Sequence, residues 1–351
     1  MESLHYAPFS QINLMDPFFD TLRADYTEFP SWFSRKAEQN EFAYVLVDGA
    51  SIDGFMYLKE EIGPITDIYP NLPPGKHLKV GTFKFNSHGT RRGERFIKKI
   101  FDHALTLDVD SIYVTVFDKH HYLKNLFAKY GFISHGTKST PNGTETVMAR
   151  SMRYQLGSTL STYPFVKLSQ ANSYLLSIYP QFHSRMLPDS ILNNETHDII
   201  QDVSHSNSIH KIYICGMGGV SSFRTGDNLI LYRTSDNKGP ARFRSVATSI
   251  GVVEEYKNIK EFESLSAFIE YCAPYSIFRN DELARIYNEK KYCHIIRFTY
   301  NAALAKRITR GDLIDEVGLD ESEYWGVMQL TNQQFSHIAR LGAVNESLIV
   351  D

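Results

Sequence analysis

The stretch from His77 to Ala104 most constrains the fold of this chain, because its pattern is that of a strand that runs through a glycine-containing loop into a helix. Apolar residues alternate with others over 77–85, which is the period of a β-strand. The loop 86–93 follows, and apolar residues then recur at helical spacing at Phe96, Ile97, Ile100, Phe101 and Ala104. A helix that begins directly after such a loop leaves backbone N–H groups unpaired at the positive end of its dipole. The stretch therefore predicts an anion cradle suited to a pyrophosphate.

Two common phosphate-binding motifs are absent from the sequence. There is no Gly-x-x-x-x-Gly-Lys-Ser/Thr, which argues against a P-loop nucleotide hydrolase, and no Gly-x-Gly-x-x-Gly, which argues against a dinucleotide fold. The cradle is therefore expected to serve another kind of ligand.

The length and composition of the chain narrow its class. Its 351 residues suggest two domains. The longest apolar runs fall far short of the roughly 20 residues of a membrane helix, and no signal sequence opens the chain, so we expect a cytoplasmic protein without a membrane partner. The three cysteines, Cys215, Cys272 and Cys293, are predicted to be reduced core thiols rather than a disulfide frame or zinc site. A net charge of −3 argues against a generally basic nucleic-acid coat.

The flanking segments predict a mixed sheet with helices on its faces. Residues 1–40 are expected to be helical, with Asp16 as an N-cap before Pro17. Residues 42–59 predict a hairpin around a turn rich in Asp and Gly, followed by a proline-rich connection. After the 77–104 unit we expect a strand at 110–117, a helix at 119–129 that ends at Gly131, and a strand at 145–150.

Two motifs in this order resemble the GNAT family of N-acetyltransferases. The run Thr90-Arg91-Arg92-Gly93-Glu94-Arg95 is similar to the family's acetyl-CoA loop, Gln/Arg-x-x-Gly-x-Gly/Ala, with Thr90 and Arg95 departing from it. The run Leu126-Phe127-Ala128-Lys129-Tyr130-Gly131-Phe132 matches a helix end of the pattern Leu-Tyr-x-x-x-Gly-Phe. The resemblance covers about residues 15–153 and implies an α/β (α+β) fold for a first domain, 1–153.

The resemblance also implies a mechanism and a set of site residues. The co-substrate would be acetyl-CoA, and the acceptor amine would attack its thioester directly. The backbone of Arg91, Arg92, Gly93, Glu94 and Arg95 would hold the pyrophosphate. The exposed edge of the strand that carries Phe83 and Phe85 would pair with the pantetheine amides.

The sequence leaves the acid and the base of this reaction open. The family often uses the tyrosine of the second motif to protonate the departing thiolate, but Phe127 stands there. Tyr130 or Tyr122 could take the role, thiolate departure could need no strong acid, or the site could have ceased to catalyse. Candidate bases are Glu60, Glu61 and His88.

The second half predicts a connector over 154–207, packed on domain surfaces, and a second domain over 208–351. Its short strands and interposed helices suggest a small β-barrel, and the runs 224–233 and 246–255 resemble the PUA-like superfamily that includes ASCH and EVE domains. That resemblance implies binding of RNA or a modified nucleotide. The cations that could contact phosphates are Arg233, Lys238, Arg242 and Arg244.

The sequence therefore predicts an acetyl-CoA-dependent N-acetyltransferase whose amine acceptor is linked to RNA or a nucleotide through the PUA-like domain. Two alternatives stay open. One is a small-molecule or protein N-acetyltransferase whose second domain is structural. The other is a non-catalytic sensor that binds an acyl-CoA or a nucleic acid. The acceptor and any homo-oligomeric assembly also stay open.

Overall fold

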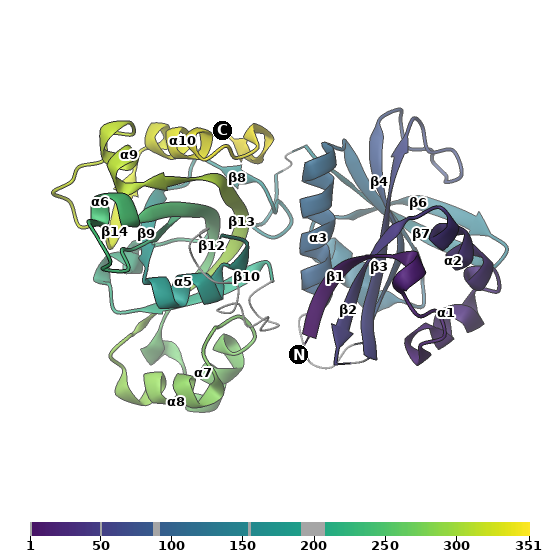
Figure 1. The fold of residues 1–351 in the computed structure, drawn as a ribbon, viewed down its shortest axis with the longest axis horizontal. Coiled ribbons are helices and arrows are strands. Elements are labelled where there is room, and N and C mark those ends of the chain that lie inside the picture. Colours follow the sequence, from purple (N-terminus) through teal and green to yellow (C-terminus); the bar gives the residue numbers. More distant parts are fainter. Residues whose placement is uncertain (1, 50, 87–91, 154–155, 191–207) are drawn as a thin grey trace. The chain divides into compact units, whose positions relative to one another are not determined.

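The computed structural model describes residues 2–49, 51–86, 92–153, 156–190 and 208–351. They form two compact units, Met1–Gln155 and Leu156–Asp351, which Figure 1 colours purple to blue and teal to yellow. The end of the predicted first domain, between residues 153 and 154, lies next to residues outside this description, so the predicted boundary stays a prediction. No helix of the described residues is long and apolar enough to cross a membrane.

Unit 1 contains a seven-stranded sheet in the order β1-β2-β3-β4-β5-β7-β6. Neighbouring strands are antiparallel except for β4 and β5, which are parallel. The strands are β1 (Glu2–Pro8), β2 (Phe42–Asp48), β3 (Ser51–Ile62), β4 (Lys76–Phe85), β5 (Ser111–Phe117), β6 (Ile133–Thr140) and β7 (Gly143–Ser151). This mixed α/β architecture confirms the predicted fold class of unit 1.

Helices cover both faces of this sheet, with α3 on one face and α1 and α2 on the other (Figure 1). The helices are η1 (Phe9–Gln11), η2 (Pro17–Phe19), α1 (Asp20–Asp25), α2 (Phe29–Glu38), α3 (Arg92–Leu107) and α4 (His121–Lys129). The predicted N-cap is confirmed, because Asp16 Oδ1 accepts a hydrogen bond from the Phe18 N–H at 2.8 Å. Gly131 has a φ of 80° just after α4, as its predicted role in ending that helix requires.

The prediction that residues 1–40 are helical is wrong at its beginning. Residues 2–8 form the edge strand β1, which pairs with the whole of β2. Its polar residues lower the apolar periodicity, and its partner lies about 40 residues further along the chain, so local patterning does not reveal it.

Unit 2 contains a six-stranded sheet in the order β10-β13-β12-β11-β9-β14 and a two-stranded pair, β8 and β15. The strands are β8 (Val166–Lys167), β9 (Ser173–Ile178), β10 (His210–Cys215), β11 (Asn228–Arg233), β12 (Val246–Asn258), β13 (His294–Thr309), β14 (Val327–Leu330) and β15 (Ile349–Val350). The helices are α5 (Pro180–Met186), η3 (Pro188–Ser190), η5 (Gly218–Ser222), α6 (Ala241–Arg244), η6 (Ile259–Glu261), α7 (Leu265–Cys272), α8 (Asn280–Glu289), α9 (Arg310–Asp315), α10 (Asn332–Leu341) and η7 (Glu346–Leu348). The three cysteines are free thiols, and Cys215 and Cys272 are buried as predicted, whereas Cys293 is only partly buried.

Two expectations for the second half need correction. The expected closed barrel is not present in the described residues, because no pairing joins the edge strands β10 and β14. The predicted connector is also not confined to domain surfaces, since β9 lies inside the sheet between β11 and β14. Every residue of β9 is buried, so this strand lacks the alternation that marks a half-exposed strand.

Candidate functional site

The candidate site begins at a bulge in β4. Leu58 of β3 pairs with Val80 and the preceding Tyr57 pairs with Thr82, so Gly81 is an extra residue in β4. A Cβ at Gly81 would lie 2.9 Å from Tyr57 Cδ1, which explains why glycine suits this position. A bulge bends its strand and increases the local twist.

Beyond this bulge, β4 loses its partner on one side. The parallel pairing with β5 runs from His77 opposite Ser111 to Val80 opposite Val114 and goes no further. Residues 82–85 still pair with β3 on the other side. Among the described residues, no strand pairs with this edge of β4 beyond Val80, so its backbone donors and acceptors can pair with an extended ligand.

A cavity of about 700 Å³ occupies the space between the diverging strands. Residues 79–85 of β4 and 114–117 of β5 form its floor, and residues of α1, α2 and the start of α4 form its sides. The structure thus joins a free strand edge and a cavity, and Gly93 in the first turn of α3 lies close to the cavity residue Phe85.

Aromatic side chains form the face of this cavity that points toward α3. Phe83 packs edge-on against Phe96 at 5.4 Å and against Phe127 at 5.6 Å between ring centroids. Gly93 belongs to the same packing, because a Cβ there would lie 2.8 Å from Leu126 Cδ2 and 2.9 Å from Phe85 Cζ. Gly93 therefore serves the close approach of α3 to β4.

The side chains at the start of α3 are held by the protein itself. The Arg92 guanidinium lies 3.0 Å from Asp53 Oδ2 and donates to the Asn86 carbonyl at 3.0 Å. Glu94 is buried and lies 2.8 Å from Lys129 Nζ, and Arg95 is fully buried. These contacts anchor the helix start. Arg91 and the candidate base His88 lie outside the described residues.

The structure distinguishes between the two tyrosines that could act as the acid, given that Phe127 has no proton to donate. Tyr122 lines the cavity and is 60% exposed. Tyr130 is fully buried, does not line the cavity, and its carbonyl accepts a hydrogen bond from Arg150. Phe127 itself lines the cavity. Of the two tyrosines, Tyr122 is therefore the one placed to act there.

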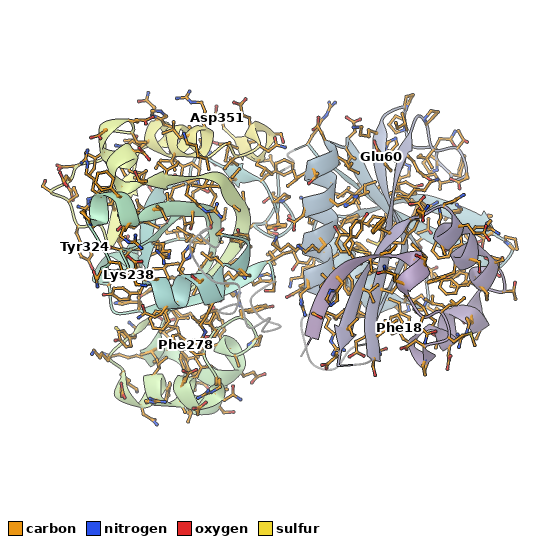
Figure 2. All side chains as sticks on the ribbon, in the orientation of Figure 1. Phe18, Glu60, Lys238, Phe278, Tyr324 and Asp351 are labelled. Atoms are coloured by element: carbon orange, nitrogen blue, oxygen red, sulfur yellow. The ribbon has the colours of Figure 1, made fainter. Side chains whose placement is uncertain are left out.

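The structure places Glu60 and Glu61 outside the cavity lining. Glu60 lies 3.6 Å from Lys76 Nζ, and Figure 2 shows it well apart from Phe18, which contacts the cavity residue Lys84. Glu61 accepts hydrogen bonds from Lys59 Nζ at 2.7 Å and from the Tyr113 hydroxyl. Burial alone would raise the pKa of Glu61, but these hydrogen bonds lower it below its ordinary value. Neither carboxylate is placed as a base at the cavity.

Glu145 is the carboxylate that sequence reasoning missed. It lies on β7 opposite Phe117 of β5, lines the cavity and is 8% exposed. Burial raises its pKa above the ordinary value, against the effect of a hydrogen bond from the Thr115 hydroxyl and of the charges of Lys138 and Lys79. A signal was present, because Glu145 is in phase with the buried Val147 and Ala149 at the two-residue period of a strand.

Lys79 and Tyr26 lie on the same cavity as Glu145. Burial lowers the pKa of the Lys79 amine. Burial raises the pKa of Tyr26, and the charge of Glu145 adds to the effect. Three titratable groups with shifted pKa values, Glu145, Lys79 and Tyr26, therefore lie on the face of the cavity that is opposite α3.

The four cations predicted to contact nucleic acid do not form an open basic patch. Arg242 pairs with Asp315 at 2.5 Å, and Arg244 pairs with Asp236 at 2.5 Å. The Arg244 guanidinium holds the pKa of Asp236 below its usual range. Arg233 is buried and Lys238 is exposed. Two of the four are thus occupied by neighbouring acids.

A separate cavity of about 1250 Å³ lies in unit 2, at the C-terminal ends of β9, β10 and β11. Exposed tyrosines line it, among them Tyr179 and Tyr324, which are 63% and 66% exposed. Arg310 also lines it, with its guanidinium 4.5 Å from the centroid of the Trp325 ring. Tyr324 is labelled in Figure 2. This cavity combines aromatic surface with the cations Arg285 and Arg310, and the acids Asp236, Glu282 and Glu289 also line it.

Comparison with known proteins gives structural matches alone. No protein-family model matches the chain, and no curated protein matches its sequence. An IAA acetyltransferase from Bacillus cereus ATCC 14579 is similar at 13% identity over 43% of this chain and 99% of its own, with a TM-score of 0.31. A putative phosphinothricin N-acetyltransferase is similar at 16% identity over 43% and 98%, with a TM-score of 0.32. The NatC complex bound to Gag peptide and CoA is similar at 14% identity over 42% and 98%, with a TM-score of 0.29. Scores of this size do not by themselves assign an activity to this chain.

Proposed function

We propose that unit 1 is an acetyl-CoA-dependent N-acyltransferase. The observation that carries the proposal is the end of the β4–β5 pairing at Val80 and Val114, which leaves a free strand edge along a cavity of about 700 Å³. The pantetheine arm of acetyl-CoA is an extended chain with two amide groups, and it could pair with that edge as a further strand would. The N-terminal end of α3 would receive the pyrophosphate, because the positive end of the helix dipole favours an anion there.

The acceptor amine would enter on the face lined by Tyr26, Lys79 and Glu145. Its nitrogen attacks the thioester carbonyl, the C–N bond forms, and the C–S bond then breaks to release CoA. The nitrogen must lose a proton, and the Glu145 carboxylate is placed to accept it. A carboxylate whose pKa is raised by burial is a better base near neutral pH than an exposed one.

Protonation of the departing thiolate falls to Tyr122 in this proposal. Phe127 occupies the wall of the cavity but carries no proton. Tyr122 packs against Phe85 with ring centroids 6.0 Å apart, and the residue is exposed. The CoA thiol is acidic enough to leave without much help, so this contribution is expected to be smaller than that of Glu145.

Calorimetric titration of acetyl-CoA into the full chain tests the proposed site. Thr82→Trp places a large side chain on the floor of the cavity and should weaken binding at least about tenfold. Thr106→Trp, on the exposed side of α3, is the matched control and should bind like the wild type. Failure of the wild type to bind would refute the proposal, and equal binding by Thr82→Trp would place the ligand elsewhere.

Turnover separates the enzyme from the sensor that the sequence left open. The assay follows CoA release with a panel of amines, including polyamines, lysine peptides and peptides with free N-termini. CoA release that depends on both the amine and Glu145 supports the transferase. Tight acetyl-CoA binding without release for any amine supports a sensor built on the same fold.

We further propose that the acceptor is linked to RNA or a nucleotide, held by the cavity of unit 2. Arg285 and Arg310 line that cavity, and neither forms an ion pair within the described ranges, unlike Arg242 and Arg244. Tyrosine faces can stack a base while arginines hold a phosphate. If the second domain is only structural, the acceptor is instead a small molecule or a protein.

Anisotropy of a labelled single-stranded RNA at several salt concentrations tests this second proposal. Arg310→Ala should weaken binding and reduce its salt dependence, because one phosphate contact is lost. Arg242→Ala should leave binding unchanged, since that arginine pairs with Asp315 outside the cavity lining. If Arg242→Ala weakens RNA binding and Arg310→Ala does not, the RNA binds the predicted cations Arg233, Lys238, Arg242 and Arg244 instead of the cavity. If the wild type does not bind RNA, a structural second domain is favoured.

A further inference from the structure

Lys79 is distinguished from the other lysines of unit 1 by its contacts. Within the described residues, its Nζ makes no hydrogen bond or ion pair, and its nearest ring is that of Tyr113, with the centroid 5.5 Å away. All other lysines of the unit have a carboxylate, carbonyl or hydroxyl partner: Lys36, Lys59, Lys76, Lys84, Lys98, Lys99, Lys119, Lys124, Lys129 and Lys138.

This unpaired amine lies where the site opens. Lys79 is the residue before Val80, at which β4 and β5 separate, and its side chain lines the cavity. Its strand partners Lys59 and Tyr113 place it on the face of Glu61 and Glu145, opposite α3. An acyl group delivered along the free edge of β4 would reach the cavity beside this amine.

The surroundings of Lys79 favour the neutral amine. Burial is the largest effect and lowers its pKa, and the charges of Lys138 and Lys59 act in the same direction. Glu61 and Asp67 act in the opposite direction and are outweighed. The neutral amine is the nucleophilic form of lysine, and each unit by which the pKa falls increases its fraction about tenfold near neutral pH.

We propose that Lys79 is a self-acetylation site, modified by acetyl-CoA bound in the cavity of its own chain; the inference rests on the proposed function. The neutral Nζ attacks the thioester carbonyl, a C–N bond forms, and the C–S bond breaks. The nitrogen gives up one proton to Glu145, and CoA leaves as a thiolate that takes up a proton to become the thiol. The products are acetyl-lysine and CoA, so atoms and charge balance without another reactant.

Lys84 is an internal control for this proposal. It also lines the cavity, but its Nζ donates to the Phe18 carbonyl and to Thr21 Oγ1, the latter at 2.6 Å. Burial lowers the pKa of Lys84 as it does that of Lys79, so the two lysines differ in their contacts. The hydrogen bonds to Phe18 and Thr21 hold the Lys84 amine away from the reaction. Acetylated Lys79 has lost its charge and occupies the space beside Glu145, so self-acetylation is expected to slow transfer to an acceptor.

The experiment incubates the full chain with isotopically labelled acetyl-CoA at neutral pH and measures occupancy at every lysine by peptide mass spectrometry. Lys79 should exceed both Lys84 and Lys124, which does not line the cavity, by roughly tenfold or more, because a bound thioester has a high effective concentration. Excess CoA and prior unfolding should each abolish the difference. The rate should not depend on protein concentration, Lys79→Arg should remove the modification, and Glu145→Gln should slow it.

Two results would overturn the inference on separate grounds. Calorimetric binding of acetyl-CoA with no preference for Lys79 would refute self-acetylation and leave the proposed function intact, whereas absence of binding would refute both. Acetyl phosphate, which lacks the CoA moiety, is the matched reagent. If it labels Lys79 with the same preference, the lysine is merely reactive and the cavity does not direct the reaction.

Discussion

The largest sheet of each unit has a glycine at or beside a register shift, but a cavity opens between strands in unit 1 alone among the described parts of the chain. In unit 1, the parallel pairing of β4 and β5 does not resume after the bulge at Gly81. In unit 2, β12 and β13 shift register at several places, including beside Gly251, and pair again after each shift. Resumed pairing bends a sheet, whereas pairing that ends leaves an edge for a ligand. The cavity of unit 2 lies instead at strand ends.

The largest effect expected from this difference concerns Glu145, because the free edge of β4 offers backbone groups but no base. Glu145→Gln should lower kcat by about 10²–10⁴-fold, the usual contribution of a general base, while acetyl-CoA binding stays unchanged. Steady-state CoA release with an active amine measures it. Glu60→Gln, outside the cavity, is the control. Equal losses in both variants, or none in Glu145→Gln, would remove Glu145 from the mechanism.

A smaller loss is expected at the opposite wall of the unit 1 cavity. Tyr122→Phe should lower kcat by roughly tenfold to 100-fold, because thiolate departure would lose its proton donor. Adding Phe127→Tyr in that background should restore part of the rate, since Phe127 lies on the same cavity. Comparison of kcat for the wild type, the single variant and the double variant shows whether Tyr122 donates the proton. Unchanged turnover in Tyr122→Phe would mean that the thiolate leaves without an acid.

Two glycines test whether the bending of a sheet and the opening of a cavity are separable: Gly81, the extra residue of its bulge, and Gly251, which lies beside a register shift. Gly81→Ala and Gly251→Ala should each lower the free energy of unfolding by about 1–3 kcal/mol. Gly251→Ala should cost more, because its Cβ would lie 2.7 Å from the Thr299 carbonyl oxygen, while that of Gly81 meets the Tyr57 side chain at 2.9 Å. Denaturant unfolding measures stability, and calorimetry measures acetyl-CoA binding. Only Gly81→Ala should weaken the binding of acetyl-CoA. Equal weakening in both variants would contradict a local role for the end of the β4–β5 pairing in binding.

The local parts of unit 1 could be predicted from the sequence, since they depend on neighbouring residues. The hairpin of β2 and β3, the N-cap at Asp16 and the end of α4 at Gly131 all follow from turn and cap chemistry. Strand β9 could not be predicted in the same way, because its partners β11 and β14 are distant in sequence and both of its faces are buried.

The side-chain roles at the site were harder to predict than its backbone. The strand, loop and helix that frame the cavity follow from periodicity, but acidic residues near a loop do not reveal which of them faces a ligand. Glu61 is close to the site in sequence and yet bonds Lys59 and Tyr113, whereas Glu145 reaches the cavity from β7, opposite Phe117. Only the pairing of distant strands distinguishes these two carboxylates.

The smallest expected effects are changes of stability with pH, and Glu61 and Glu145 should differ in sign. The pKa of Glu145 is raised in the folded protein, mainly by burial, so folding favours its protonated form. The stability this provides is complete below the unfolded pKa of about 4.3 and is lost as the pH rises through the raised value. Glu145→Gln should therefore raise the Tm relative to wild type near pH 7 and have little effect near pH 4.

Glu61 should behave in the opposite way, because its pKa is lowered in the folded protein by the hydrogen bonds from Lys59 and Tyr113, which outweigh burial. Its contribution to stability is present above the unfolded pKa and is lost as the pH falls through the lowered value. Glu61→Gln should thus lower the Tm near pH 7, and the difference should shrink on acidification toward pH 3. Thermal unfolding of both variants across this pH range measures the effect. Shifts of the same sign would mean that both carboxylates are structural, and Glu145 would lose the property that distinguishes it as the base.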